Sequence, residues 1–243
     1  MAIRLHQGVA VMPADTKVSG YTIVQSPKLP VRSWMRVSRI ETGRSFKMAR
    51  YEVGYLVGSL SSTSINRLLS KALVQLAPPE LRLTEIAIRD LPLYSQDYDA
   101  DYPPVARSFK QAIADVDAVL FVTPEYNRSI PGGLKNAIDW ASRPYGQNAL
   151  SRKPSGVIGT SPGSIGTAVA QSHLRGVLCF CNAPLMTSVE AYVQFRPGAI
   201  GADGKVSDGS TADFLRNYMK EFLGFVAAAD GAVAATRTTR SAA

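Results

Sequence analysis

The stretch of sequence that decides the fold spans residues 52–66 and reads EVGYLVGSLSSTSIN. Its first part, Glu52 to Val57, is a short apolar run typical of a buried strand. A loop rich in Gly, Ser and Thr follows at once, from Gly58 to Asn66. From Ile65 to Leu76 the apolar residues recur at the spacing of one buried helix stripe. The stretch therefore predicts a strand, a tight loop and a helix.

A second apolar run with a similar continuation lies about sixty residues further on. Ala118 to Val122 is apolar at every position, as expected for a strand covered on both faces. It leads into the loop Pro124-Glu125-Tyr126-Asn127 and a helix expected over 133–141. In an open parallel sheet, ligands bind at the carboxyl ends of the strands, where the strand order reverses. We expect the two loops to meet in that crevice.

The rest of the chain continues the alternation. Further strands are expected over 81–88, 155–160 and 185–189. A further helix is expected to begin near Pro103. Another is expected from the end of the loop 161–166 to about Phe180, and a last one from about Ser210 to Ala228. Five alternations with short connections predict an α/β fold, a doubly wound five-stranded parallel sheet in three layers.

Charge and composition divide the chain into three parts. Residues 1–47 hold eight Lys and Arg against two acidic residues, so this segment carries +6 of the formal net charge of +8. We expect a basic N-terminal extension over 1–47, a folded domain over 48–226, and a C-terminal tail over 227–243 that frays because it has little to bury. The extension could be an organelle-type presequence, a solvated tail, or residues added by start-site choice upstream of Met48. We favour the last interpretation.

Several partner classes are not expected. The nearly balanced residues after position 47 lack a broad electrostatic footprint for nucleic acid. A membrane-spanning helix is not expected either, because no run of about eighteen apolar residues occurs. Cys179 and Cys181 match neither the Cys-x-x-Cys motif nor the usual zinc ligand sets, so we expect two buried core thiols and no metal site. A cytoplasmic location follows as the default.

The loop 58–66 has the chemistry of a phosphate site. Small residues let backbone N–H groups approach a ligand, and the helix that begins at Ile65 presents its positive end. The loop matches neither the Walker pattern nor the Gly-x-Gly-x-x-Gly fingerprint. Ser, Thr and Asn are also ordinary helix caps, but their density here favours a site. The candidate donors are Ser59, Ser61, Ser62, Thr63, Ser64 and Asn66.

The loop after the second apolar run offers groups for a flat heterocycle. Backbone groups around Pro124 could bind its polar edge while Tyr126 lies near its face. Glu125 could act as a general acid or base, or it could hold the loop or a neighbouring subunit through hydrogen bonds. We assign it no catalytic role.

A third loop, 161–166, completes the expected crevice. Its Gly163 and Gly166 permit either close approach to a ligand or simply a tight turn. His173, inside the following helix, is expected to be structural or interfacial because no further metal ligands accompany it in the sequence.

Together the loops resemble the NAD(P)H-dependent FMN reductase family, a flavodoxin-like group that includes quinone, chromate and azo-dye reductases. The resemblance covers about residues 51–193 and rests on GSLSSTSIN at 58–66, TPEYN at 123–127 and PGGLKNAIDW at 131–140. The last two stretches are highly specific. The resemblance implies a flavodoxin-like fold and non-covalently bound FMN, whereas the extension over 1–47 lies outside the family pattern.

The resemblance also implies which residues hold FMN. The phosphate would be held by Ser59, Ser61, Ser64, Ile65 and Asn66; the isoalloxazine by Pro124, Glu125, Tyr126 and Asn127; and the far side of the ring by Ser161 and Gly163. Many members have Arg where this chain has Ser61. This difference removes one charge contact to phosphate or NADPH, which Arg67 or Arg128 could supply instead.

The implied activity is transfer of hydride from NADPH or NADH to FMN and on to a quinone, free flavin or similar small acceptor, with ping-pong kinetics. No side chain need act as acid or base, so no catalytic residue is assigned. One alternative is a flavodoxin-type electron carrier reduced by a partner protein, although such carriers usually present acidic surfaces. Another is a flavin-free enzyme that binds phosphate esters or nucleotides.

The resemblance implies a homodimer or homotetramer with the flavin near the interface. Trp140, Arg143 and Tyr145 are candidate interface residues, with core packing as the alternative role of Trp140.

Overall fold

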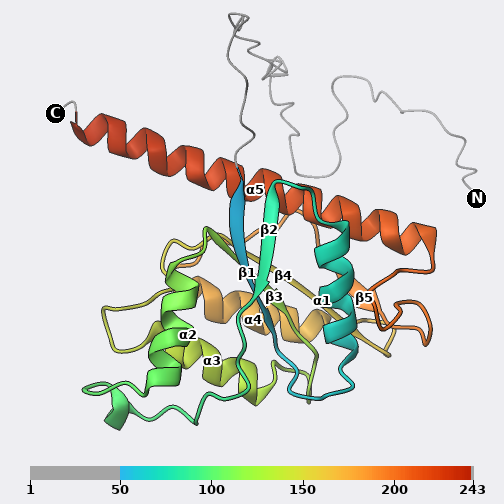
Figure 1. The fold of residues 1–243 in the computed structure, drawn as a ribbon, viewed down its shortest axis with the longest axis horizontal. Coiled ribbons are helices and arrows are strands. Elements are labelled where there is room, and N and C mark those ends of the chain that lie inside the picture. Colours follow the sequence, from blue (N-terminus) through green and yellow to red (C-terminus); the bar gives the residue numbers. More distant parts are fainter. Residues whose placement is uncertain (1–49, 242–243) are drawn as a thin grey trace, which may run out of the picture. The chain divides into compact units, whose positions relative to one another are not determined.

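The computed structural model describes residues 50–241, and the predicted basic extension over 1–47 lies outside these described residues. Strands and helices alternate along the described part (Figure 1). The strands are β1 (Tyr51–Val57), β2 (Leu81–Glu85), β3 (Ala118–Val122), β4 (Ser155–Ser161) and β5 (Tyr192–Gln194). The helices are α1 (Ile65–Leu76), α2 (Pro104–Ala114), α3 (Gly132–Ser142), α4 (Ala168–Phe180) and α5 (Gly209–Ser241), with a short 3-10 turn, η1 (Gln96–Tyr98).

The strands form one parallel sheet in the order β2-β1-β3-β4-β5. This is the strand order of a flavodoxin-like doubly wound sheet, in which the direction of winding reverses between β1 and β3. Val57 and Val122, the last residues of these two strands, are register partners. The Gly58 N–H donates to the Val122 carbonyl at 2.8 Å. The loops after β1 and β3 therefore start side by side, as predicted.

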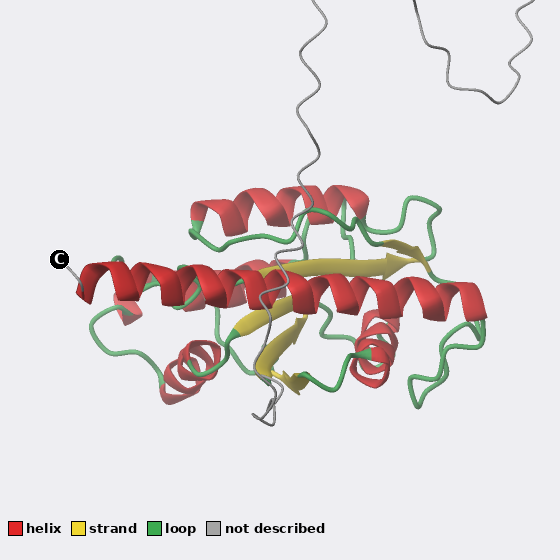
Figure 2. Cartoon of the chain, turned by 90° about the horizontal axis from the view of Figure 1, so that it is seen from above, coloured by secondary structure: helices red, strands yellow, loops and turns green. Residues whose placement is uncertain are grey.

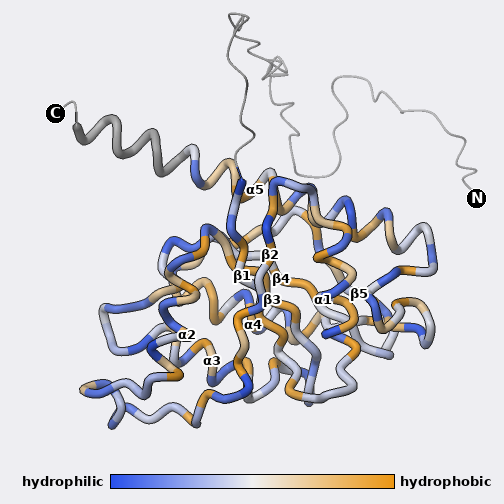
Figure 3. The backbone as a smooth tube through the Cα atoms, in the orientation of Figure 1, coloured by the Kyte–Doolittle hydropathy of each residue, from blue (hydrophilic) through white to orange (hydrophobic). Residues whose placement is uncertain are grey.

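Two hydrophobic clusters lie between the sheet and its helices. On one face α1 and α5 bury side chains such as Leu73 and Phe222. On the other face α2, α3 and α4 bury Phe109, Leu134 and Leu178. Figure 2 shows helices on both sides of the strands, and β3, which is buried at all its positions, is among the hydrophobic stretches in Figure 3. Burial of each such side chain contributes about 1.5–3 kcal/mol. The predicted three-layer α/β fold is confirmed.

The fifth strand lies later than predicted. We expected it over 185–189, but Leu185 forms only an isolated bridge to Ser155, and β5 pairs with Gly159–Ser161 instead. Between these contacts Met186 and Ala191 bury their side chains in the α1 and α5 cluster. Packing thus holds this apolar segment without a continuous ladder, and an apolar run alone does not distinguish the two arrangements.

Two other boundaries differ from expectation. β2 ends at Glu85 rather than at Ile88, because Ile86 and Ile88 leave the sheet to pack in the α2 to α4 cluster. α5 continues to Ser241, whereas we expected a helix end near Ala228 and a frayed tail. The segment is rich in Ala, which has the highest intrinsic helix propensity and keeps the backbone helical without burial. No helix of residues 50–241 is both long and apolar enough to cross a membrane.

The two cysteines do not share one environment. Cys181 is buried, as predicted, and burial raises the pKa of its thiol. Cys179 is exposed, so its predicted core position is wrong. The reason is helical geometry, because positions two apart at a helix end point in nearly opposite directions.

Gly159 marks a close approach of β4 to the end of β3. A Cβ at this position would lie 2.0 Å from the Thr123 carbonyl oxygen and 2.3 Å from Thr167 Oγ1. We expect Gly159→Ala to lower the free energy of unfolding by at least about 2 kcal/mol in urea denaturation, because the clash includes backbone. At Gly224 in α5 a Cβ would meet nothing within 4 Å. The control Gly224→Ala should raise stability by about 0.5–1 kcal/mol, and equal losses in both variants would contradict the close approach.

Candidate functional site

The predicted site residues lie in three loops at the carboxyl ends of neighbouring strands, or directly beside them, with Ile65 and Asn66 in the first turn of α1 and Ser161 at the end of β4. The loops are residues 58–64 after β1, 123–131 after β3 and 162–167 after β4, followed by α1, α3 and α4 (Figure 1). The sheet order therefore brings together segments that lie about one hundred residues apart in the sequence.

The hydroxyl groups of the first loop shape its backbone. Ser59 Oγ accepts from the Ser61 N–H at 3.4 Å, and Ser61 Oγ accepts from the Thr63 N–H at 3.2 Å. Ser64 is the N-cap of α1, and its Oγ accepts from the Arg67 N–H at 3.3 Å. The capping role that hydroxyl residues commonly take is thus real for Ser64.

The start of α1 offers donors for an anion. The Ile65 and Asn66 N–H groups stand in the first turn, where no intrahelical acceptor exists. Within residues 50–241 they donate to no other backbone carbonyl. Together with the positive end of the helix dipole they suit a phosphate group.

The Asn66 side chain has a structural role beside the predicted one. It is 1% exposed, its Nδ2 donates to the Thr160 carbonyl at 2.9 Å, and its Oδ1 accepts from the Thr160 N–H at 3.0 Å. Both amide atoms therefore tie the start of α1 to β4. These bonds use Oδ1 and one of the two Nδ2 hydrogens, and the assignment of Asn66 to the phosphate site stays a prediction.

The second loop contains a strained turn. Tyr126 and Ser129 exchange backbone hydrogen bonds of 3.0 and 2.9 Å, and the two residues between them, Asn127 and Arg128, have φ of 50° and 59°. Positive φ at both central positions defines a type I′ turn, and a non-glycine residue there costs on the order of 1 kcal/mol. The turn leaves Tyr126 52% exposed, beside a buried Pro124.

Glu125 connects the second loop to α4. Its side chain is 9% exposed, and Oε2 accepts from the N–H groups of Val169 and Ala170 at 3.1 Å each. Oε1 pairs with Arg128 at 3.0 Å. Charge-assisted hydrogen bonds of this kind are stronger than neutral ones. Of the two predicted roles, the structure supports the one in which Glu125 holds the loop.

The third loop closes on itself and leaves one open position. Ser161 Oγ donates to the Gly166 carbonyl at 2.6 Å, and Gly166 has φ of +58°. A Cβ on Gly166 would lie 2.8 Å from Tyr192 backbone, so this glycine serves the tight turn. At Gly163 a Cβ would meet only Ser161 Oγ, at 3.5 Å. Space for the edge of a ligand therefore remains at Gly163.

The arginines near the crevice differ in their partners. Arg67 Nη1 contacts both carboxylate oxygens of Glu85 at 2.8 Å, and Arg128 pairs with Glu125. Arg67 and Arg128 were the two candidates to supply the charge that many family members have from an Arg at the position of Ser61. Both are thus paired with a carboxylate. Arg89, which sequence reasoning missed, donates from Nη2 to the Leu60 carbonyl in the first loop. Its position follows from the pairing of β1 with β2, and no local pattern indicates it.

The donor set of the three loops fits FMN. Backbone N–H groups at α1 suit its phosphate, and the second and third loops offer backbone groups, an exposed aromatic ring and an open glycine for a planar heterocycle. Among the described residues, no group of three or more His, Cys, Asp or Glu side chains lies close enough to hold a metal ion.

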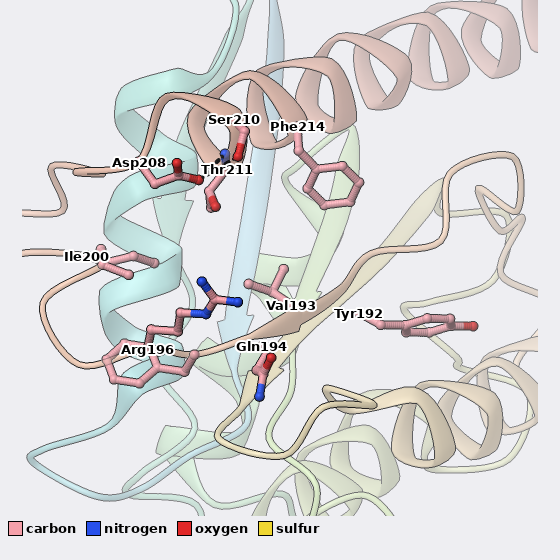
Figure 4. A pocket seen from close by; sticks show the side chains of 11 residues that line it. Tyr192, Val193, Gln194, Arg196, Ile200, Asp208, Ser210, Thr211 and Phe214 are labelled. Atoms are coloured by element: carbon pink, nitrogen blue, oxygen red, sulfur yellow. Dashed lines mark hydrogen bonds between the residues drawn. The ribbon is translucent and has the colours of Figure 1, made fainter.

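A separate cavity of about 430 Å³ lies between β5 and the start of α5 (Figure 4). It shares no residue with the three loops. Its acidic residue, Asp208, accepts from the Thr211 N–H at 2.8 Å and from Ser210 Oγ at 2.7 Å. Hydrogen bonds from Thr211 and Ser210 lower the pKa of Asp208 to about 2. This carboxylate therefore caps α5.

The predicted interface residues divide between core and surface. Trp140 is fully buried, and its Nε1 donates to the Pro92 carbonyl at 2.7 Å, so it is a core residue. Tyr145 is 91% exposed. His173 Nδ1 lies 3.1 Å from Ser129 Oγ, which gives this histidine a structural contact between α4 and the second loop.

Comparison with known proteins identifies relatives over this same region. The profile of a family described as NADPH-dependent FMN reductase matches residues 51–198. A 2-hydroxy-1,4-benzoquinone reductase of a Burkholderia species is 50% identical over 175 residues, which cover 72% of this chain and 96% of that protein. A quinone reductase of Pseudomonas putida is 46% identical over 177 residues, 72% of this chain and 95% of that protein. Among solved structures, FerB, a flavoenzyme NAD(P)H:(acceptor) oxidoreductase from Paracoccus denitrificans, has 46% identity and a TM-score of 0.70, covering 72% of this chain and 97% of that one.

The role of Asn66 can be separated from ligand binding. In Asn66→Asp a carboxylate oxygen would face the Thr160 carbonyl, so we expect the flavin-free protein to lose at least about 2 kcal/mol of unfolding free energy in urea. Asn182→Asp is the control, because Asn182 is exposed and has φ of 56°, which Asp tolerates. If Asn66→Asp kept full stability and lost only FMN affinity, the structural role would be contradicted and the phosphate-site prediction supported.

Proposed function

This chain belongs to the NADPH-dependent FMN reductase family, and we propose that its acceptor is a quinone or similar small molecule, reduced in a ping-pong reaction. The chain is an NAD(P)H-dependent oxidoreductase that uses FMN. Relatives with 46–50% identity that are named for quinone reduction support this acceptor class.

The observation that carries the proposal is the juxtaposition of the loops after β1 and β3, joined where Gly58 donates to Val122. The first loop and α1 would hold the FMN phosphate through the Ile65 and Asn66 N–H groups. The second and third loops would hold the ring, through backbone of Pro124 to Asn127 and the space at Gly163. FMN, when bound, supplies the hydride-accepting chemistry.

The protein's own contribution is position. Glu125 is committed to two backbone N–H groups and to Arg128, so it is not free to move a proton to or from a substrate. Ser161 and Ser64 are likewise committed to backbone partners. We therefore assign no side chain a role as general acid or base.

An anaerobic visible spectrum of the protein supplied with FMN tests the function. We expect NADPH, NADH or both to bleach the flavin band near ~450 nm, a property of the cofactor, and a quinone to restore it. Initial rates at several quinone concentrations should give parallel double-reciprocal lines. Binding of FMN without bleaching by either nucleotide would favour the electron carrier, and failure to bind FMN would overturn the assignment.

We also propose that the protein is a homodimer or homotetramer. Phe180 and Tyr145 are 89% and 91% exposed, and they line one surface cavity together with Val177. Large exposed aromatic side chains gathered in this way are typical of protein interfaces.

Sedimentation velocity tests the oligomer. Phe180→Glu should reduce the wild-type mass to that of a smaller species, because it places a charge in the contact. Leu93, which is 83% exposed outside this cavity, provides the control Leu93→Glu. A wild-type monomer, or dissociation by the Leu93 variant alone, would contradict the proposal.

A cytoplasmic location is part of the same proposal. Both cysteines are free thiols, which suits a reducing compartment.

A further inference from the structure

Among the described residues, Arg89 is an arginine beside the first loop, residues 58–64, that has no acidic partner. It follows β2, and its Nη2 donates to the carbonyl of Leu60, in the middle of the first loop. Within residues 50–241 no carboxylate lies at salt-bridge distance from it. Its positive charge is therefore not cancelled by a neighbouring side chain.

The two other arginines of the crevice provide the contrast. Arg67 faces Glu85 with both carboxylate oxygens at 2.8 Å, and Arg128 faces Glu125 at 3.0 Å. Neither has a free charge to offer an anion. Of these three arginines, Arg89 is therefore the one whose charge is not paired within residues 50–241. Together with the amino end of α1 it gives the first loop a positive potential.

The fold holds Arg89 in place. The preceding residue, Ile88, is 6% exposed and packs in the α2 to α4 cluster, while Arg89 itself is exposed. The backbone is thus anchored and the guanidinium projects to the first loop. A guanidinium carries five N–H donors, so the bond to Leu60 leaves others for a ligand.

We propose that Arg89 is a phosphate-binding residue, which reaches the FMN 5′-phosphate from across the first loop. This inference rests on the proposed function, because it places the phosphate in that loop. Guanidinium groups bind phosphate oxygens through charge-assisted, often paired, hydrogen bonds. The phosphate would then have donors from two segments of the chain. The start of α1, after β1, would contribute backbone N–H groups, and the segment after β2 would contribute the Arg89 side chain.

Flavin titrations of the flavin-free full-length chain test the proposal, with FMN and riboflavin as the two probes. Riboflavin has the same ring without the phosphate. We expect Arg89→Ala to raise the Kd of FMN about tenfold and to leave the Kd of riboflavin unchanged, since a hydrogen bond to a charged group is lost. Arg89→Lys should keep most of the FMN affinity. The FMN affinity of the wild type should also fall with added salt more steeply than that of Arg89→Ala.

Arg82→Ala is the matched control. Arg82 is an exposed arginine near the start of β2, at the opposite end of the strand, where it pairs with Glu52. It should change neither Kd. Thermal unfolding of each flavin-free variant shows whether the loop has remained folded.

The outcomes separate the two hypotheses. If wild type binds neither flavin, the proposed function fails. If wild type binds FMN but Arg89→Ala changes both Kd values equally, or neither, the inference about Arg89 is wrong. A change confined to the ratio of KM for NADPH to KM for NADH would place the guanidinium at the 2′-phosphate of the nucleotide, and would also overturn it.

Discussion

The parallel pairing of β1 with β3 is the constraint on which the rest of the site depends. A ladder in this register puts Val57 opposite Val122 and lets Gly58 donate to the Val122 carbonyl. The two loops must then diverge to opposite faces of the sheet, because α1 packs on one face and α3 on the other. The divergence lies at the switch point of the strand order, where open α/β sheets bind their ligands.

Side chains then set the geometry of the crevice by bonding to backbone. Asn66 joins the start of α1 to Thr160 of β4, and Glu125 joins the second loop to the start of α4. Each of these two pairs of hydrogen bonds joins segments that are distant in the sequence, and each uses a buried or nearly buried side chain that would be costly to leave unpaired. The residues that the family motif places near FMN thus include some whose side chains preorganise the site.

The arginines near the three loops differ in whether they pair with a carboxylate. Arg67 and Arg128 pair with carboxylates, whereas Arg89 donates to the Leu60 carbonyl of the first loop. An ion pair near the surface contributes little to stability, about 0–1 kcal/mol. The main effect of these pairs is therefore to leave one arginine with an unpaired charge in the described part of the chain. All three arginines carry the same charge, so the carboxylates beside them decide which one is unpaired.

Most of the fold was determined by the sequence itself. The buried run Ala118–Val122, the helix stripe from Ile65 and the polar loops between them predicted the parallel sheet and the crevice, because periodicity and burial are local consequences of residue type. Two corrections, the longer α5 and the exposed Cys179, have local causes in helix propensity and helical geometry. Three further findings were not predicted: β5 lies at Tyr192–Gln194, the Asn66 side chain bonds to Thr160, and Arg89 lies beside Leu60. Each of these depends on a contact with a distant segment, and only the tertiary structure decides which polar groups satisfy one another and which remain free for a ligand.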